Sequence, residues 1–189
     1  NRILKKKPEL IIMVDCGSNS KESINILNKN NINTLIIDHH EIYKPYPKSK
    51  ILINPKKECD YNQYDYFSAA TLTYFFIDSY IRKFKLKINF KRNLIYVLLS
   101  IITDVMPLRK TNRLIAINVL KNFNLKDNFI INKIFELKKL KKKFEIDDLG
   151  FLIGPILNSA GRLDNPNKVI ELMITKNDKK KEKIIKELL

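Results

Sequence analysis

Two short apolar runs near the start of the chain end in residues that bind metal ions. The first run ends in Asp15, and the second ends in Asp38, His39 and His40. Carboxylate and imidazole groups together suit Mn²⁺, Fe²⁺, Zn²⁺ or Mg²⁺, with imidazole favouring the transition metals. In open α/β sheets the ligand site lies beyond the carboxyl ends of the strands. The pattern therefore predicts a metal site at one edge of a parallel sheet.

The same residues also have a structural interpretation. A single Asp after a strand usually caps a turn or a helix, and a single histidine usually has a structural partner. The metal interpretation gains weight because His39 and His40 are the only histidines of the chain and are adjacent. Neighbouring side chains in extended structure point in opposite directions, so we expect the two histidines to have different tasks.

A further carboxylate follows an apolar segment. Residues 94–103 predict a buried helix that ends before Asp104 and Pro107. A helix C-terminus disfavours negative charge, so Asp104 needs a cation or a basic partner. A metal ion and Arg109 are both candidates, and a plain loop carboxylate is the alternative to both.

Residues 154–164 form a short polar motif, GPILNSAGRLD. Its small residues allow close backbone approach, Asn158 and Ser159 are neutral hydrogen-bonding residues, and Arg162 offers a planar fork for phosphate. The motif indicates either a phosphate-binding segment or a helix turn with an ion pair between Arg162 and Asp164.

The hydrophobic pattern predicts the elements that position these residues. Strands are expected at residues 9–15, 34–38 and 50–54, the first two fully buried, with a helix over 21–30 between them that makes a parallel β-α-β unit. The fold class is α/β, a parallel sheet with flanking helices followed by a helical segment. We divide the chain into a domain over residues 1–125 and a helical segment over residues 126–189. Further helices are expected over 68–84, 94–103, 112–122 and 130–142, near 150–155, and from 166 and 178. In the helix over 68–84, the expected inward positions are Ala69, Leu72, Phe75, Phe76 and Tyr80.

Composition narrows the classes of protein. The 189 residues are 44% hydrophobic and 30% charged, which is typical of a folded domain, and no apolar run reaches the ~18 residues of a membrane helix. Cys16 and Cys59 are too few for a disulfide scaffold, so we expect the cytoplasm. The net charge of +16 attracts phosphate polymers, but 30 of the 36 basic residues are lysines, a bias that AT-rich coding also produces.

Together these motifs resemble those of the DHH phosphoesterases. VDCGS at 14–18, IDHH at 37–40 and ITDVMPL at 102–108 match the second, third and fourth motifs of that family. Within it, the chain is similar to the RecJ single-strand-specific exonucleases. The segments that carry this closer resemblance are the fourth motif with Asn112 and Arg113, residues 54–61, 68–70 and 154–163.

The resemblance implies a nuclease with two Mn²⁺ or Mg²⁺ ions that degrades single-stranded DNA from the 5′ end in repair and recombination. Single-strand-binding proteins or helicases are the partners it implies, with no membrane. The implied roles are metal ligation by Asp15, His39 and Asp104, a place near the scissile phosphate for His40 with support from Asp38, and contacts to the DNA backbone from Asn158, Ser159 and Arg162.

Two features depart from the family pattern. The family's first motif, an Asp-x-Asp pair, is expected some tens of residues before Asp15, yet the 14 residues that precede it contain no such pair. We therefore expect a fragment, a split-gene product or a decayed copy, without the family's C-terminal domains and with little or no activity alone. Ile156 stands where the family usually has an arginine after Gly-Pro, which removes one phosphate contact.

Two other functions stay open. One is a DHH phosphatase or nanoRNase that acts on short oligonucleotides or cyclic dinucleotides, although the fourth motif of those relatives differs from residues 103–108. The other is a non-catalytic fragment that binds nucleic acid or completes the site of another subunit.

Overall fold

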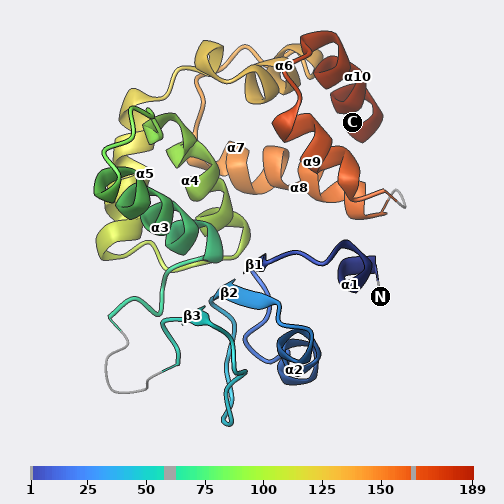
Figure 1. The fold of residues 1–189 in the computed structure, drawn as a ribbon. Helices are drawn as coiled ribbons and strands as arrows, with labels where there is room; N and C mark the ends of the chain where they lie inside the picture. Colours follow the sequence, from blue (N-terminus) through green and yellow to red (C-terminus); the bar gives the residue numbers. More distant parts are fainter. Residues whose placement is uncertain (1, 58–62, 163–164) are drawn as a thin grey trace. The chain divides into compact units, whose positions relative to one another are not determined.

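The computed structural model describes residues 2–57, 63–162 and 165–189, without the side chain of Arg162 (Figure 1). The chain forms two compact units, Asn1–Asn112 and Arg113–Leu189, and the boundary falls within helix α5 (Lys110–Asn122). The domain boundary that we predict from the sequence, at residue 125, stays a prediction.

The first unit contains a parallel sheet in the order β1-β2-β3. Its strands are β1 (Leu10–Val14), β2 (Asn33–Ile37) and β3 (Ile51–Ile53). β1 pairs with β2, and β2 pairs with β3, both in parallel. Helix α2 (Lys21–Lys29) connects β1 to β2, so the predicted β-α-β unit and the α/β fold class are confirmed.

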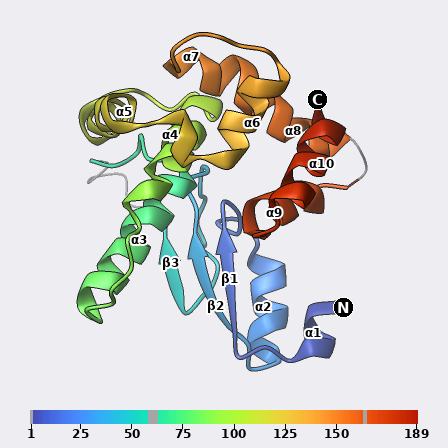
Figure 2. The ribbon, with the colours of Figure 1, turned by 90° about the horizontal axis from the view of Figure 1, so that it is seen from above.

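Helices flank this sheet. Helix α2 lies on one side of it and helix α3 (Ala69–Lys83) lies on the other (Figures 1 and 2). Helix α3 packs against α4 (Leu94–Thr103). Ser68 caps α3 by accepting a hydrogen bond from the Thr71 N–H at 3.2 Å. The largest fully buried apolar side chains of the first unit belong to Ile24, Ile36, Ile37, Leu98 and Ile101.

Strand β1 is much less buried than its sequence predicts. Leu10, Ile12 and Val14 are 49%, 56% and 43% exposed, whereas Thr34–Ile37 of β2 are buried. Within the described chain, β2 has a neighbour on each side and β1 has only β2. A continuous apolar run predicted a strand covered on both faces, and this prediction is wrong for β1 because the described residues leave the face that carries Leu10, Ile12 and Val14 largely uncovered.

Helix α3 is also less covered than predicted. Ala69 near its start is buried, as expected, but Phe75 and Tyr80 are 38% and 52% exposed, so their predicted inward position is wrong. The helix is apolar on most of its surface, and the sheet and α4 cover only part of it. The exposed Tyr80 ring lies against Phe84 instead, with ring centres 4.5 Å apart.

The second unit is helical. Its core gathers Ile131, Ile134, Leu149, Ile153, Leu172 and Ile185. Within the described residues, no helix combines the length and the hydropathy that crossing a membrane requires. The helices of this unit that follow α5 are α6 (Phe129–Leu137), α7 (Ile146–Asp148), the π-helical turn η4 (Leu149–Ile153), α8 (Gly154–Ser159), α9 (Asn167–Ile174) and α10 (Asp178–Leu188). Further short helical segments are α1 (Arg2–Lys6) and η2 (Lys91–Asn93) in the first unit, and η3 (Leu125–Asp127) and η5 (Ala160–Arg162) in the second.

Candidate metal centre

A tight turn after β1 positions the first candidate ligand. Asp15 and Gly17 have φ angles of 61° and 110°, both in the left-handed region. The Asp15 N–H still donates to the Ile37 carbonyl oxygen at 2.9 Å, so the residue stays anchored to β2. A Cβ atom at Gly17 would lie 3.1 Å from Met13 Cε and 3.3 Å from two side-chain carbons of Ile36. Gly17 therefore meets both a conformational and a steric requirement of the turn.

We expect Gly17→Ala to lower the free energy of unfolding by about 1–2 kcal/mol, since the new Cβ is strained at this φ and crowds Ile36. Urea denaturation would measure the change. Gly161→Ala is the matched control, because no atom lies within 4 Å of a Cβ at that position. A similar loss in both variants would contradict the steric interpretation.

Asp38 organises the turn after β2. Its side chain is almost fully buried; Oδ2 accepts the Ser18 N–H at 2.9 Å, and Oδ1 accepts the His39 N–H at 2.8 Å. Oδ1 also lies 2.7 Å from His40 Nδ1. Burial raises the pKa of Asp38, but the hydrogen bonds from His40 and Ser18 outweigh it and hold the pKa well below its usual value. Asp38 is therefore an ionised carboxylate that links both strand ends.

Asp15, His39 and His40 converge on one point. His39 Nε2 and His40 Nδ1 lie 3.3 Å and 3.8 Å from Asp15 Oδ1. The two imidazole rings are 4.8 Å apart at 61°, and one potential ligand atom from each of the three residues lies within 4.8 Å of the others. The expectation that the histidines point in opposite directions is wrong. Strand β2 ends at Ile37, and the N–H groups of both histidines turn toward Asp38.

The donor set of this cluster fits a divalent cation. Asp15 Oδ1 and His39 Nε2 face each other at a distance where two lone pairs repel unless a proton or a cation lies between them. His39 Nδ1 is buried and has no hydrogen-bond partner among the described residues. One carboxylate and two imidazoles suit Mn²⁺, Fe²⁺ or Zn²⁺. The cluster therefore has the chemistry of a metal centre.

We expect the Mn²⁺ affinity of the cluster to rise with pH. The hydrogen bond to Asp38 raises the pKa of His40, burial opposes this, and the charges of Asp38 and Asp15 add to it. A protonated, cationic His40 repels a metal ion held at the neighbouring Asp15, so Mn²⁺ affinity falls as the pH drops below this pKa, by at most about tenfold per pH unit. Calorimetric titration with Mn²⁺ between pH 6 and 8 measures the slope, which His40→Asn should flatten. Equal slopes in both proteins would contradict an electrostatic effect of His40 on the bound ion.

Asn54 supports the centre, although sequence reasoning gave it no role in the site. It is 8% exposed, and its Nδ2 donates to Ser18 Oγ at 2.7 Å and to the His40 carbonyl oxygen at 2.9 Å. Its Oδ1 accepts the Lys56 N–H at 2.8 Å. The only signal in the sequence is an Asn between strand β3 and Pro55. Asn54 thus ties the end of the third strand to the other two.

Asp104 lies outside the trio of converging residues. It follows α4, is exposed, and accepts a hydrogen bond from Ser100 Oγ at 3.0 Å. Arg109 pairs with Asp65 at 2.5 Å, so the alternative of an Arg109 partner for Asp104 is wrong. Ser100 and Asp15 line the same cavity of about 360 Å³, and Asp104 is not among the described residues that line it. Its metal-binding role stays a prediction.

The predicted DNA-binding residues belong to the second unit. Asn158 is exposed, whereas Ser159 Oγ lies 2.7 Å from the Ile156 carbonyl oxygen and 3.1 Å from that of Leu188. The Ser159 hydroxyl therefore ties α8 to α10. Ile156 is buried at 9% exposure, consistent with a packing role. The side chain of Arg162, its possible partner Asp164, and residues 58–62 lie outside the described part of the chain, so the roles of Asn158, Ser159 and Arg162 stay predictions.

Comparison with known sequences decides the family. The profile described as "DHH family, N-terminal domain" matches residues 1–102. The chain belongs to the DHH family. The Asp15, His39 and His40 cluster lies inside this DHH-family match, as do all three strands of the sheet.

Among members of known activity, this DHH-family chain is similar to RecJ single-stranded-DNA-specific exonucleases. It is 29% identical over 181 residues to the protein from Haemophilus influenzae, an alignment that covers 90% of this chain and 32% of that relative. The Escherichia coli protein is 26% identical over 181 residues, covering 89% of this chain and 31% of the relative. The chain thus spans about a third of the length of these relatives.

Solved structures agree on the fold. RecJ from Thermus thermophilus in complex with Mn²⁺ superposes with a TM-score of 0.85 at 20% identity, covering 99% of this chain and 28% of that one. A second exonuclease RecJ bound to manganese gives a TM-score of 0.83 at 19% identity and covers 99% of this chain and 48% of that one.

Proposed function

We propose that this chain provides the catalytic metal centre of a RecJ-type exonuclease that digests single-stranded DNA from the 5′ end. The observation that carries the proposal is the convergence of Asp15, His39 and His40 at the carboxyl edge of the parallel sheet. The similarity to single-stranded-DNA-specific exonucleases supports the same substrate. A role in DNA repair and recombination in the cytoplasm, with single-strand-binding proteins or helicases as partners, belongs to this proposal.

The chemistry is hydrolysis of a phosphodiester bond with Mn²⁺ or Mg²⁺. Asp15 and His39 hold the metal, with Asp104 as a further ligand. When bound, such ions activate a water molecule and stabilise the attacking and leaving oxygens. Asp38 fixes the His40 ring through Nδ1, so His40 can present Nε2 to the scissile phosphate. Because Asp38 keeps its negative charge, it also favours the protonated, cationic form of His40 beside that phosphate.

Strand binding in this proposal needs no base recognition. Asn158 and Arg162 would contact the sugar-phosphate backbone, which positions a strand without reading its sequence. Ser159 contributes less, because its hydroxyl already bonds backbone carbonyl oxygens.

A single-turnover assay tests the proposal with the purified chain in excess over single-stranded DNA labelled at either end. We expect slow, Mn²⁺-dependent release of mononucleotides from the 5′ end, and no release by Asp15→Asn. Slow turnover follows from the single carboxylate in the described cluster. Preferred cleavage of dinucleotides would instead indicate a nanoRNase, and strand binding without hydrolysis would indicate a non-catalytic fragment.

A further inference from the structure

The end of α3 and the segment that follows it are basic without acidic neighbours in the sequence. From Ser79 to Thr103 the chain contains no Asp or Glu. Among the described residues, Arg82 pairs with Asp78 at 2.8 Å, and the other basic side chains of this stretch form no ion pair. By contrast, Lys180, Lys181 and Lys186 of α10 are all paired with acidic residues. The basic side chains between Ser79 and Thr103 are Arg82, Lys83, Lys85, Lys87, Lys91 and Arg92.

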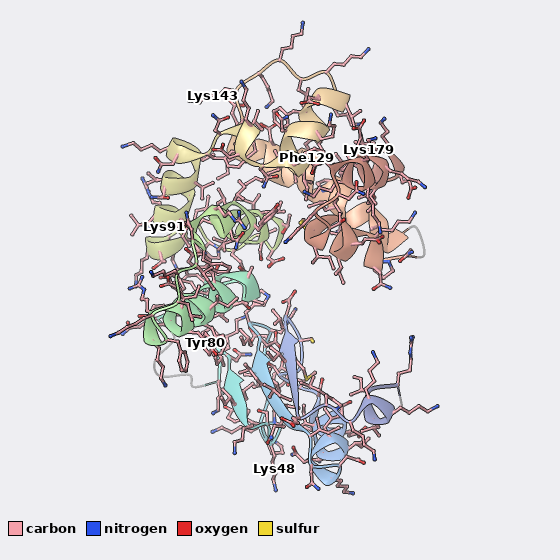
Figure 3. The ribbon with its side chains drawn as sticks, turned by 45° about the horizontal axis from the view of Figure 1, so that its top comes forward. Lys48, Tyr80, Lys91, Phe129, Lys143 and Lys179 are labelled. Carbon is pink, nitrogen blue, oxygen red and sulfur yellow. The ribbon has the colours of Figure 1, made fainter. Side chains whose placement is uncertain are left out.

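The same segment exposes large apolar side chains. We call residues 79–92 the α3 tip. Tyr80, Phe84, Leu86 and Ile88 are 52%, 54%, 41% and 56% exposed. The Tyr80 and Phe84 rings form a pair 4.5 Å apart, with Lys83 Nζ 5.8 Å from the Phe84 ring centre. Tyr80 and Lys91, both labelled in Figure 3, belong to this segment. Clustered exposed apolar groups of this kind mark interaction sites.

The α3 tip continues toward the metal centre. After Phe84 the chain turns back along α3, where the Leu86 N–H donates to the Ile81 carbonyl oxygen at 2.9 Å. Further on, Phe90 stacks on Tyr74 with ring centres 5.0 Å apart and 20° between planes. Tyr74 and Phe90 line the cavity of about 360 Å³ that Asp15 also lines. Phe90, near the end of the α3 tip, therefore lines the same cavity as Asp15 of the cluster.

We propose that the α3 tip is a contact surface for single-stranded nucleic acid, along which the strand approaches the metal centre. Bases stack on Tyr80 and Phe84, and Lys85, Lys87 and Lys91 neutralise phosphates. Paired aromatic rings beside unpaired cations bind single strands of any sequence, since every base has a π-face. Only the link to the metal centre rests on the proposed function. An anionic membrane would attract the same charges, but the cavity that Phe90 of the tip shares with Asp15 favours a phosphodiester polymer.

Binding of a fluorescent oligothymidylate to the full chain in EDTA tests the aromatic part. We expect Tyr80→Ala and Phe84→Ala each to weaken binding about tenfold, and Tyr80→Phe to bind like the parent. Tyr43→Ala is the control, because Tyr43 is 65% exposed and lies outside the tip. Circular dichroism and urea denaturation confirm that each variant is folded. Equal losses in the tip and control variants would overturn the proposal.

Salt dependence tests the charged part. The triple variant Lys85→Gln, Lys87→Gln, Lys91→Gln should make the slope of log Kobs against log salt shallower by up to about 2. The control Lys139→Gln, Lys141→Gln, Lys143→Gln removes as many exposed charges and should change it less. Equal changes, or tighter binding to phosphatidylserine vesicles than to the oligonucleotide, would overturn the proposal. EDTA prevents metal-dependent hydrolysis, so this assay measures binding alone. If the chain binds the oligonucleotide through the α3 tip but does not cleave DNA when Mn²⁺ is present, only the proposed function is contradicted.

Discussion

Replacement of Asp15 by asparagine is expected to weaken Mn²⁺ binding by at least about 100-fold. Asp15 is the one carboxylate within the cluster, and both His39 and His40 approach its Oδ1. The amide keeps the size of the side chain but removes the negative charge that a hard cation requires. Calorimetric titration with Mn²⁺ measures the loss, and the signal of free Mn²⁺ in electron paramagnetic resonance gives an independent value.

The control for this prediction is Asp127→Asn. Asp127 is an exposed carboxylate in η3, so this variant loses the same charge without touching the cluster. It should bind Mn²⁺ like the parent chain. If both variants bind equally well, the ion is held elsewhere, and the assignment of Asp15 as a ligand is contradicted.

Replacement of Asp38 by alanine is expected to lower the free energy of unfolding by about 3–4 kcal/mol and to abolish Mn²⁺ binding. The Asp38 carboxylate accepts hydrogen bonds from the backbone of Ser18, His39 and His40 and from the His40 ring. Without it, buried N–H groups lose their partner, each at a cost of about 1–3 kcal/mol before the turn relaxes. Urea denaturation measures the stability, and chemical shifts of the two histidines report the geometry of the cluster.

A core variant separates loss of stability from loss of the site. Leu98 of α4 is fully buried, and Leu98→Ala should destabilise the chain by about 2–5 kcal/mol through the cavity it leaves. Under conditions where both variants are folded, Leu98→Ala should still bind Mn²⁺ and Asp38→Ala should not. Loss of Mn²⁺ binding in both variants would mean that binding depends only on the stability of the fold and not on Asp38 itself.

The strands and their polar ends could be predicted from the sequence because the relevant signals are local. One apolar run is followed by Asp15 and another by Asp38. Because the carboxyl ends of neighbouring parallel strands lie at the same edge of a sheet, these two patterns were enough to place both residues at that edge. The segment between the two runs is long enough for a crossover helix, and α2 occupies this segment. The positions of Asp15 and Asp38 follow from that topology.

The geometry within the site depends on contacts that the sequence does not encode locally. The convergence of His39 and His40 follows from the hydrogen bonds of their N–H groups to Asp38, which end the extended conformation. The role of Asn54 depends on a contact with Ser18, 36 positions away. The exposure of β1 could not be predicted for a related reason, since a run of apolar residues does not tell a strand covered on both faces from one covered on a single face.

Within the described residues, β1 lies at the edge of the sheet, and this position affects how copies of the isolated chain behave together. A strand with an open side and exposed Leu10, Ile12 and Val14 is a template for edge-to-edge association. The net charge of +16 opposes such association, because approaching copies repel one another. Added salt screens this repulsion while leaving the apolar surface in place. Solubility of the isolated chain should therefore fall as ionic strength rises, and a lysine in place of Ile12 should restore it.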